Sequence, residues 1–326
     1  MTIWIVFLIL IFFLLALDLG VFHKSPHSIS TKEAFGWTVL WVSLASLFSF
    51  VVYFAYENAW VANPDKLDGK EAVLEYITGY LIEQSLSMDN IFVMAVIFGY
   101  FKIPKIYQHR VLFWGIIGAL LFRGIMIGLG VVLIHQFSWI IYVFGALLLY
   151  SAYRMFFSDG EGVHPENNPV IKLVRRFFPV TKDFHGNHFF IRRKIGDKKI
   201  IAATPLFIAL MVVETTDVFF AVDSIPAIFA ITTDPFLVFT SNIFAIMGLR
   251  SLYFVLASVL DKFKYLKYSL VFILAFVGVK MLLSHYVKIP AWLSLTVIAG
   301  ALLLGVIISW SSFKEKRQVE KEKVGI

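Results

Sequence analysis

The chain has 326 residues, of which 59% are hydrophobic and only 16% are charged, and its mean hydropathy is +0.81. Soluble globular domains do not reach this composition, so we expect an all-α polytopic membrane protein. The absence of cysteine excludes disulfides and thiolate metal sites. The net charge of +7 does not indicate nucleic-acid binding, because the basic residues lie mostly in predicted loops.

Nine apolar stretches are each long enough to cross a bilayer. They cover residues 3–22, 35–56, 72–99, 110–134, 137–157, 201–231, 236–260, 266–286 and 290–311. The first contains Asp18 and has no basic residues before it, so we expect a retained helix and not a cleaved signal peptide. The predicted organisation is a helix pair (1–71), a first three-span unit (72–157), a cytoplasmic loop (158–200), a second three-span unit (201–286), and a last span with a charged tail (287–326).

The distribution of Lys and Arg predicts the orientation. If the N-terminus is outside, the inner loops and the tail hold 22 of these residues and the outer loops hold 3. Because inner loops of membrane proteins are enriched in Lys and Arg, we expect the N-terminus outside and the C-terminus in the cytoplasm.

The long loop contains a basic amphipathic segment at 171–178, expected on the anionic inner leaflet, and a β-hairpin turning at 196–197.

Residues 214–226 carry three carboxylates, Glu214, Asp217 and Asp223, inside an apolar span. Each ionisable group at that depth costs at least ~2.5–3.5 kcal/mol on insertion scales, so a charged ligand is the simplest explanation for three. Residues 83–91 match residues 217–225, because an acid is followed six residues later by a second acid, a small polar residue and Ile. Two arginines, Arg123 and Arg250, then align in the middle of the following spans.

The two matching units are three crossings apart, so their orientations in the membrane are opposite. Spans 3–5 and 6–8 are therefore predicted to form a 3+3 inverted repeat, the architecture of many secondary transporters. On straight helices, six residues correspond to a rotation of 240°, which would turn each second acid away from the first. Pro226, and more weakly residues 85–87, could interrupt the helices. We therefore predict that both spans are discontinuous and that Glu83, Asp89, Asp217 and Asp223 meet near the midplane.

The candidate metal ligands offer oxygen atoms. They are Glu83, Asp89, Asn90, Glu214, Asp217, Asp223 and Ser224, with Asp18 and Met88 as further candidates. Oxygen ligands suit a hard divalent cation such as Mn²⁺, Ca²⁺ or Mg²⁺. Asp18 is equally compatible with a helix end in headgroup water, and for Met88 ordinary packing is favoured. Arg123 and Arg250 are expected to balance the charge of the empty site by pairing with carboxylates.

Crowded carboxylates hold protons that an entering cation must displace, which predicts exchange of protons for metal.

At residues 16–22, 83–90, 204–206, 214–227 and 241–254 the chain resembles the TerC family of integral membrane proteins, in its Alx-like branch. The resemblance implies a manganese exporter of the bacterial inner membrane, and it carries the acidic ligands over to Glu83, Asp89, Glu214, Asp217 and Asp223, with Asp18 in a further matching segment. The direction of transport rests on this resemblance alone.

Other functions were weighed against export. The chain lacks Gly-x-Gly-Asp, Gly-x-Ser-Gly and His-Glu-x-x-His, which argues against an intramembrane hydrolase, so we expect no enzymatic activity and no resident cofactor. The alternative is a membrane protein that binds metal to supply or sense it for other proteins without net transport. The sequence leaves open this choice, the choice among Mn²⁺, Ca²⁺ and Mg²⁺, the counter-ion and the oligomeric state.

Overall fold

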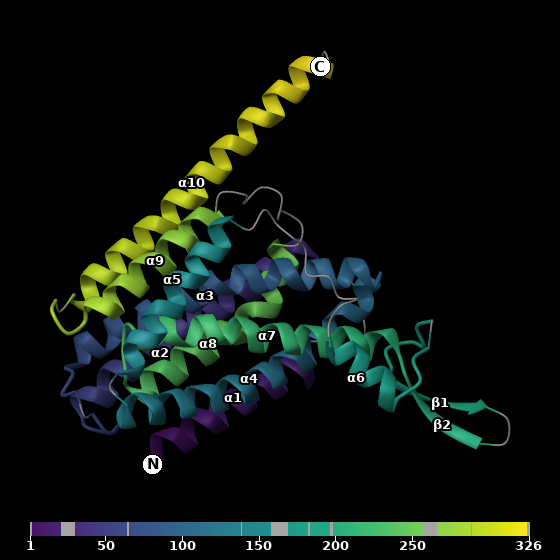
Figure 1. Cartoon of the computed structure of the whole chain (residues 1–326), viewed down its shortest axis with the longest axis horizontal. Coiled ribbons are helices and arrows are strands. Elements are labelled where there is room, and N and C mark those ends of the chain that lie inside the picture. Colours follow the sequence, from purple (N-terminus) through teal and green to yellow (C-terminus); the bar gives the residue numbers. More distant parts are fainter. Residues whose placement is uncertain are drawn as a thin grey trace.

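The computed structural model describes residues 2–20, 30–63, 65–137, 139–157, 169–181, 183–195, 198–256, 266–287 and 289–324. Within these ranges the chain is a set of helices with one hairpin (Figure 1). The elements are α1 (Thr2–Gly20), α2 (Thr31–Glu57), α3 (Gly69–Tyr100), α4 (Lys105–Gln136), α5 (Ile140–Phe157), α6 (Pro169–Phe177), β1 (Phe190–Ile195), β2 (Lys198–Ala203), α7 (Pro205–Phe229), α8 (Pro235–Leu256), α9 (Leu266–Leu283) and α10 (Ala291–Val324).

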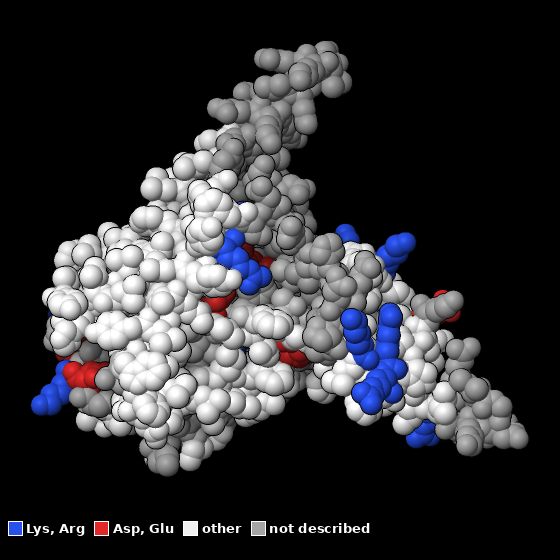
Figure 2. Space-filling model, viewed as in Figure 1, with Lys and Arg blue, Asp and Glu red and all other residues white. Residues whose placement is uncertain are grey.

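Eight of the described helices are long and apolar enough to cross a membrane: α2, α3, α4, α5, α7, α8, α9 and the Ala291–Ser309 part of α10. A shorter apolar stretch, Thr2–Leu17, lies in α1. Each of the nine predicted spans therefore corresponds to an apolar helix, and the prediction of a polytopic, all-helical membrane protein is confirmed. Figure 2 agrees with this, since most of the visible surface is uncharged and several basic residues gather over α6.

The long loop contains the two predicted elements. The basic amphipathic segment forms α6, and Ile171 and Val174 are its buried residues. The predicted hairpin is formed by β1 and β2, which pair antiparallel from Phe190 opposite Ala203 to Ile195 opposite Lys198. Its turn at 196–197 lies outside the described residues. Because β2 occupies residues 198–203, the sixth span begins at Pro205 and not at residue 201.

The helix starts follow from local chemistry. The Asp68 carboxylate accepts from the backbone N–H of Glu71, whose side chain accepts from the N–H of Asp68, and this capping box begins α3. Pro205 is the first residue of α7, where its missing N–H costs no hydrogen bond. At the start of α8, the buried Asp234 carboxylate accepts from the backbone N–H groups of Phe236 and Leu237.

The prediction of two discontinuous spans is wrong. The first of them, α3, is unbroken from Gly69 to Tyr100, and α7 continues through Pro226 to Phe229. Pro226 lies in the last turn of α7, so little helix follows the backbone hydrogen bond that it removes. In α3 the hydroxyl of Ser85 donates to the carbonyl of Leu81 within the same helix, so this serine does not divert the backbone.

Four helices, α3, α4, α7 and α8, form a central bundle (Figure 1). Within it, α3 packs mainly on α8, and α7 packs mainly on α4. In each pair, the first helix of one predicted unit (α3 or α7) therefore contacts the second helix of the other unit (α8 or α4). This is the packing expected if the two units are interleaved. The inverted repeat itself stays a prediction. Outside the bundle, α5 and α9 pack on each other, and we call this pair of helices the arm. Helix α10 packs against α9.

Candidate functional site

Arg123 is a buried charge at the point where the helices of the central bundle meet. Its side chain lies near the middle of α4 and is 1% exposed. Its Nη1 atom donates to Oε1 of Glu83 on α3. Its Nη2 and Nε atoms donate to Oδ1 and Oδ2 of Asp217 on α7, at 3.0 and 3.3 Å. One guanidinium group therefore joins a carboxylate from each predicted unit, and it binds Asp217 through both oxygens.

Neutral polar groups complete this network around the charges. The contacts are Asn90 Nδ2 to Asp217 Oδ1 at 3.2 Å, Ser87 Oγ to Glu83 Oε1 at 3.5 Å, Arg123 Nη1 to Asn242 Oδ1 at 3.0 Å, and Arg123 Nη1 to Ser224 Oγ at 3.4 Å. We call the residues joined in this way the Arg123 network. Ser87 and Asn242 were not among the predicted site residues, although each is a polar residue in an apolar span.

The network has spare acceptor capacity. Among the residues that the structure describes, Oε2 of Glu83 and Oδ1 of Asn90 are buried oxygen atoms without a hydrogen-bond partner. Oε2 of Glu214, one turn before Asp217 on α7, has the same property within the described part of the chain. Buried acceptors are nearly always paired in folded proteins. Each of these three unpaired acceptors would therefore be stabilised by a cation or a donor.

The Glu214 side chain approaches α4 closely. A Cβ atom added at Gly118 would overlap the Glu214 carboxylate, so glycine is what leaves room for that carboxylate. Asp217 acts electrostatically on Glu214, so the two acids on this face of α7 form one group of charges. Residues three apart lie on the same face of a helix, which is why these two acids are neighbours.

Two small hollows border Asp217. One is lined by Asn90, Met94, Ile97 and other residues of α3 and α7. The second reaches Asp217 from α4 and α8 and is lined by the buried Arg250. Both extend toward the C-terminal end of α3, which is the end of the bundle that carries α6 and the hairpin (Figure 1).

The four predicted acids do not meet. Glu83 and Asp217 join the Arg123 network, whereas Asp223 accepts from Ser151 of α5 at 2.6 Å. The reason is the continuity of α3 and α7, since each second acid stays 240° around its helix from the first. Within the described ranges, no three acidic or histidine side chains converge on a position that could hold a metal ion. The prediction that all four carboxylates meet is therefore wrong for this structure, and the assignment of each residue as a metal ligand stays a prediction.

Two further candidates from the sequence are Met88 and Asp18. Met88 packs against the hydrophobic cluster that contains Ile91, which is the packing role favoured from the sequence. Asp18 belongs to α1, but its side chain lies outside the described residues.

These features define a multi-pass membrane protein with a buried network of opposite charges at its centre. The chain belongs to the TerC family: the family model described as "Integral membrane protein TerC family" matches residues 68–318. An uncharacterized membrane protein of Myxococcus xanthus is 50% identical over 313 residues, which cover 96% of this chain and 92% of that one. An uncharacterized membrane protein of Rickettsia bellii is 43% identical over 306 residues, covering 94% and 96%.

A further relative is the Escherichia coli K12 protein called "Putative membrane-bound redox modulator Alx", which is 41% identical over 320 residues, covering 97% of this chain and 96% of that one. No solved structure matches the chain at a significant level.

Proposed function

We propose that the protein is a secondary transporter that exports a divalent metal ion, with Mn²⁺ as the favoured cargo, through the Arg123 network in exchange for protons. The observation that carries the proposal is the pair of buried carboxylates, Glu83 and Asp217, held by one guanidinium group between apolar spanning helices. Ionisable groups inside a membrane are costly and are typical of ion and proton pathways. The proposal assigns no catalytic reaction, resident cofactor or nucleic-acid partner to the chain.

The donor set favours a hard cation. The carboxylates of Glu83 and Asp217, the amide oxygen of Asn90 and the adjacent Glu214 supply only oxygen, which suits Mn²⁺, Ca²⁺ or Mg²⁺ better than a soft metal. Ser224, which accepts from Arg123, completes the set at the network, whereas Asp89 and Asp223 stay predicted ligands that lie outside it. The choice of Mn²⁺ and of outward transport follows the family resemblance.

The charges also favour exchange with protons. When all are ionised, Arg123, its two ion-pair partners and Glu214 carry a formal net charge of −2. One divalent cation or two protons would neutralise this charge, so alternating between the two loads keeps the site neutral throughout the cycle. Arg250, which borders the same hollow as Asp217, would add a positive charge on the side that carries α6.

The name of the Alx relatives suggests redox modulation as a different function. This chain contains no cysteine, so it has no thiol with which to perform thiol–disulfide exchange. We therefore favour metal transport, and we keep as the alternative a membrane protein that binds metal without net transport.

The test is Mn²⁺ movement in inside-out membrane vesicles that contain the full chain. We expect vesicles with the wild type to accumulate Mn²⁺ when their interior is acidic, and Asp217→Asn to remove this uptake. Asp65→Asn, a change at an exposed carboxylate in the loop before α3, is the matched control and should behave as the wild type. Equal uptake by Asp217→Asn and the wild type would disprove this site. Stoichiometric Mn²⁺ binding without uptake would favour the non-transporting alternative.

A further inference from the structure

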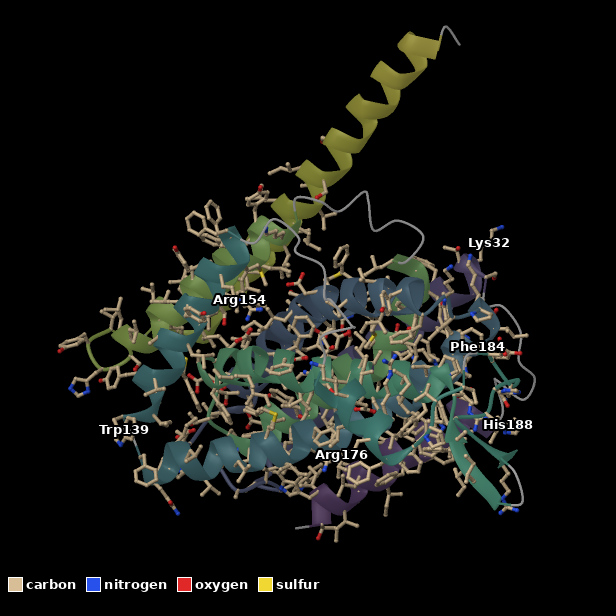
Figure 3. The ribbon with its side chains drawn as sticks, turned by 45° about the vertical axis from the view of Figure 1, so that its right-hand side comes forward. Lys32, Trp139, Arg154, Arg176, Phe184 and His188 are labelled. Carbon is tan, nitrogen blue, oxygen red and sulfur yellow. The ribbon has the colours of Figure 1, made fainter. Side chains whose placement is uncertain are left out.

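The second acid of each matched stretch faces the arm and not Arg123. On α7, Asp223 is half-buried, and its Oδ1 atom accepts from Oγ of Ser151 on α5 at 2.6 Å. Arg154, one turn further along α5, acts electrostatically on Asp223. Figure 3 shows Arg154 extending from α5 on the side of the central bundle.

The other second acid, Asp89 on α3, is also half-buried, and the positive charge of Lys267 at the start of α9 acts on it. In both cases a base from the third helix of one predicted unit acts on an acid from the first helix of the other unit. We call the hydrogen bond between Asp223 and Ser151 the arm contact.

The arm itself is packed backbone to backbone. A Cβ atom added at Gly145 of α5 would lie 3.1 Å from the carbonyl oxygen of Gly278 on α9, and one added at Gly278 would lie 3.0 Å from that of Gly145. Such close crossings at small residues are typical of firmly associated membrane helices. Helices α5 and α9 contact each other more extensively than they contact the central bundle.

We propose that α5 and α9 move as one body relative to α3 and α7 during transport. Ser151 holds this body to Asp223, and the positive charges of Arg154 and Lys267 attract Asp223 and Asp89. The inference rests on the proposed function, since it assigns the motion to the transport cycle.

Cross-linking in the naturally cysteine-free chain tests the motion. The rings of Phe144 on α5 and Phe229 on α7 stack with centroids 6.3 Å apart, so Phe144→Cys/Phe229→Cys can join the arm to the bundle through a short reducible thiol cross-linker. The matched control is Phe156→Cys/Tyr268→Cys, which joins α5 to α9 within the arm across the same 6.3 Å. We expect the first cross-link to slow Mn²⁺ uptake by at least about tenfold and reduction to restore it, because such closures often limit turnover.

We expect the control cross-link to leave the rate within about twofold of the uncross-linked protein, since it joins helices that move together. Undiminished transport with the first cross-link would show that the arm does not move against α7. Arrest by the control cross-link would show that α5 and α9 are not one body. Either result overturns the inference.

A second measurement does not depend on transport. Arg154→Gln in the Phe144→Cys/Phe229→Cys background should slow the initial cross-linking rate by about fivefold, the size of coupling expected for contacting charged groups. Arg175→Gln on the exposed face of α6 should leave this rate unchanged. If Arg154→Gln cross-links at the parent rate, the charged contact does not hold the arm. If the wild type shows no Mn²⁺ uptake, the proposed function fails while this measurement still tests the contact.

Discussion

The Glu214 carboxylate of α7 occupies the space that a side chain at Gly118 of α4 would fill. Gly118→Ala should therefore displace the Glu214 carboxylate and lower the Mn²⁺ uptake rate by about tenfold or more, because small displacements of binding groups have large kinetic effects. Gly128→Ala, on the same helix, meets no atom within 4 Å and is the matched control. Equal uptake rates for the two variants would mean that Glu214 takes no part in transport.

Removing the guanidinium group at the centre should destabilise the fold. Arg123→Gln leaves Glu83 and Asp217 buried without their counter-charge, which costs about 3–5 kcal/mol for a buried ion pair. Thermal unfolding of the detergent-solubilised protein should show a clear fall in Tm at neutral pH. Arg175→Gln, at an exposed position of α6, should keep the wild-type Tm. An unchanged Tm for Arg123→Gln would show that the ion pairs contribute no net stability.

The cap of α8 should make stability depend on pH. Burial raises the pKa of the Asp234 carboxyl, although the N–H groups of Phe236 and Leu237 oppose this shift. The folded state therefore holds this proton more tightly than the unfolded state, whose Asp pKa is ~3.9. The resulting stabilisation is complete below that value and is lost as the pH rises through the raised pKa.

Asp234→Asn keeps an oxygen to cap α8 but cannot ionise. We expect wild type and variant to have similar Tm values near pH 4, and the wild type to fall below the variant as the pH increases. Asp68→Asn changes the exposed cap of α3 and serves as the control, with the wild-type pH profile expected. Parallel pH profiles for wild type and Asp234→Asn would rule out this assignment.

The orientation can be read with single cysteines, since the chain has none of its own. Tyr286, between α9 and α10, is 82% exposed, and Phe177, at the end of α6, is 70% exposed. With the N-terminus outside, a membrane-impermeant thiol reagent should label Tyr286→Cys in intact cells and Phe177→Cys only after permeabilisation. The reverse labelling pattern would invert the predicted topology.

The sequence predicts the spans well because apolar stretches of that length have few alternatives to a membrane helix. It also predicts a hairpin and an amphipathic helix in the long loop, and both are present. The matched stretches identify Glu83 and Asp217, which lie at one site although 134 positions separate them in the sequence. Pairing of a mid-span arginine with these acids follows from the cost of leaving either charge alone in the membrane.

Residue type alone could not decide whether α3 and α7 are broken. Proline weakens a helix everywhere, but its effect depends on how much helix follows, and Pro226 stands in the last turn of α7. The prediction that four acids meet at one point assumed that both helices are broken. Because they are continuous, the predicted positions of Asp89 and Asp223 are wrong as well. Asn242 was missed because a single amide in an apolar span has no distinguishing spacing, and only the packing of α8 against α4 brings it to Arg123.

If the protein is the proposed exporter, the Arg123 guanidinium group and the transported metal ion compete for the same carboxylates. Its guanidinium group is attached to α4 and stays at a fixed, high effective concentration beside Glu83 and Asp217. A metal ion must outcompete it before the site can load, so the apparent affinity is weaker than the oxygen ligands alone would give. An exporter with this property needs a higher metal concentration to load than the same site would need without Arg123.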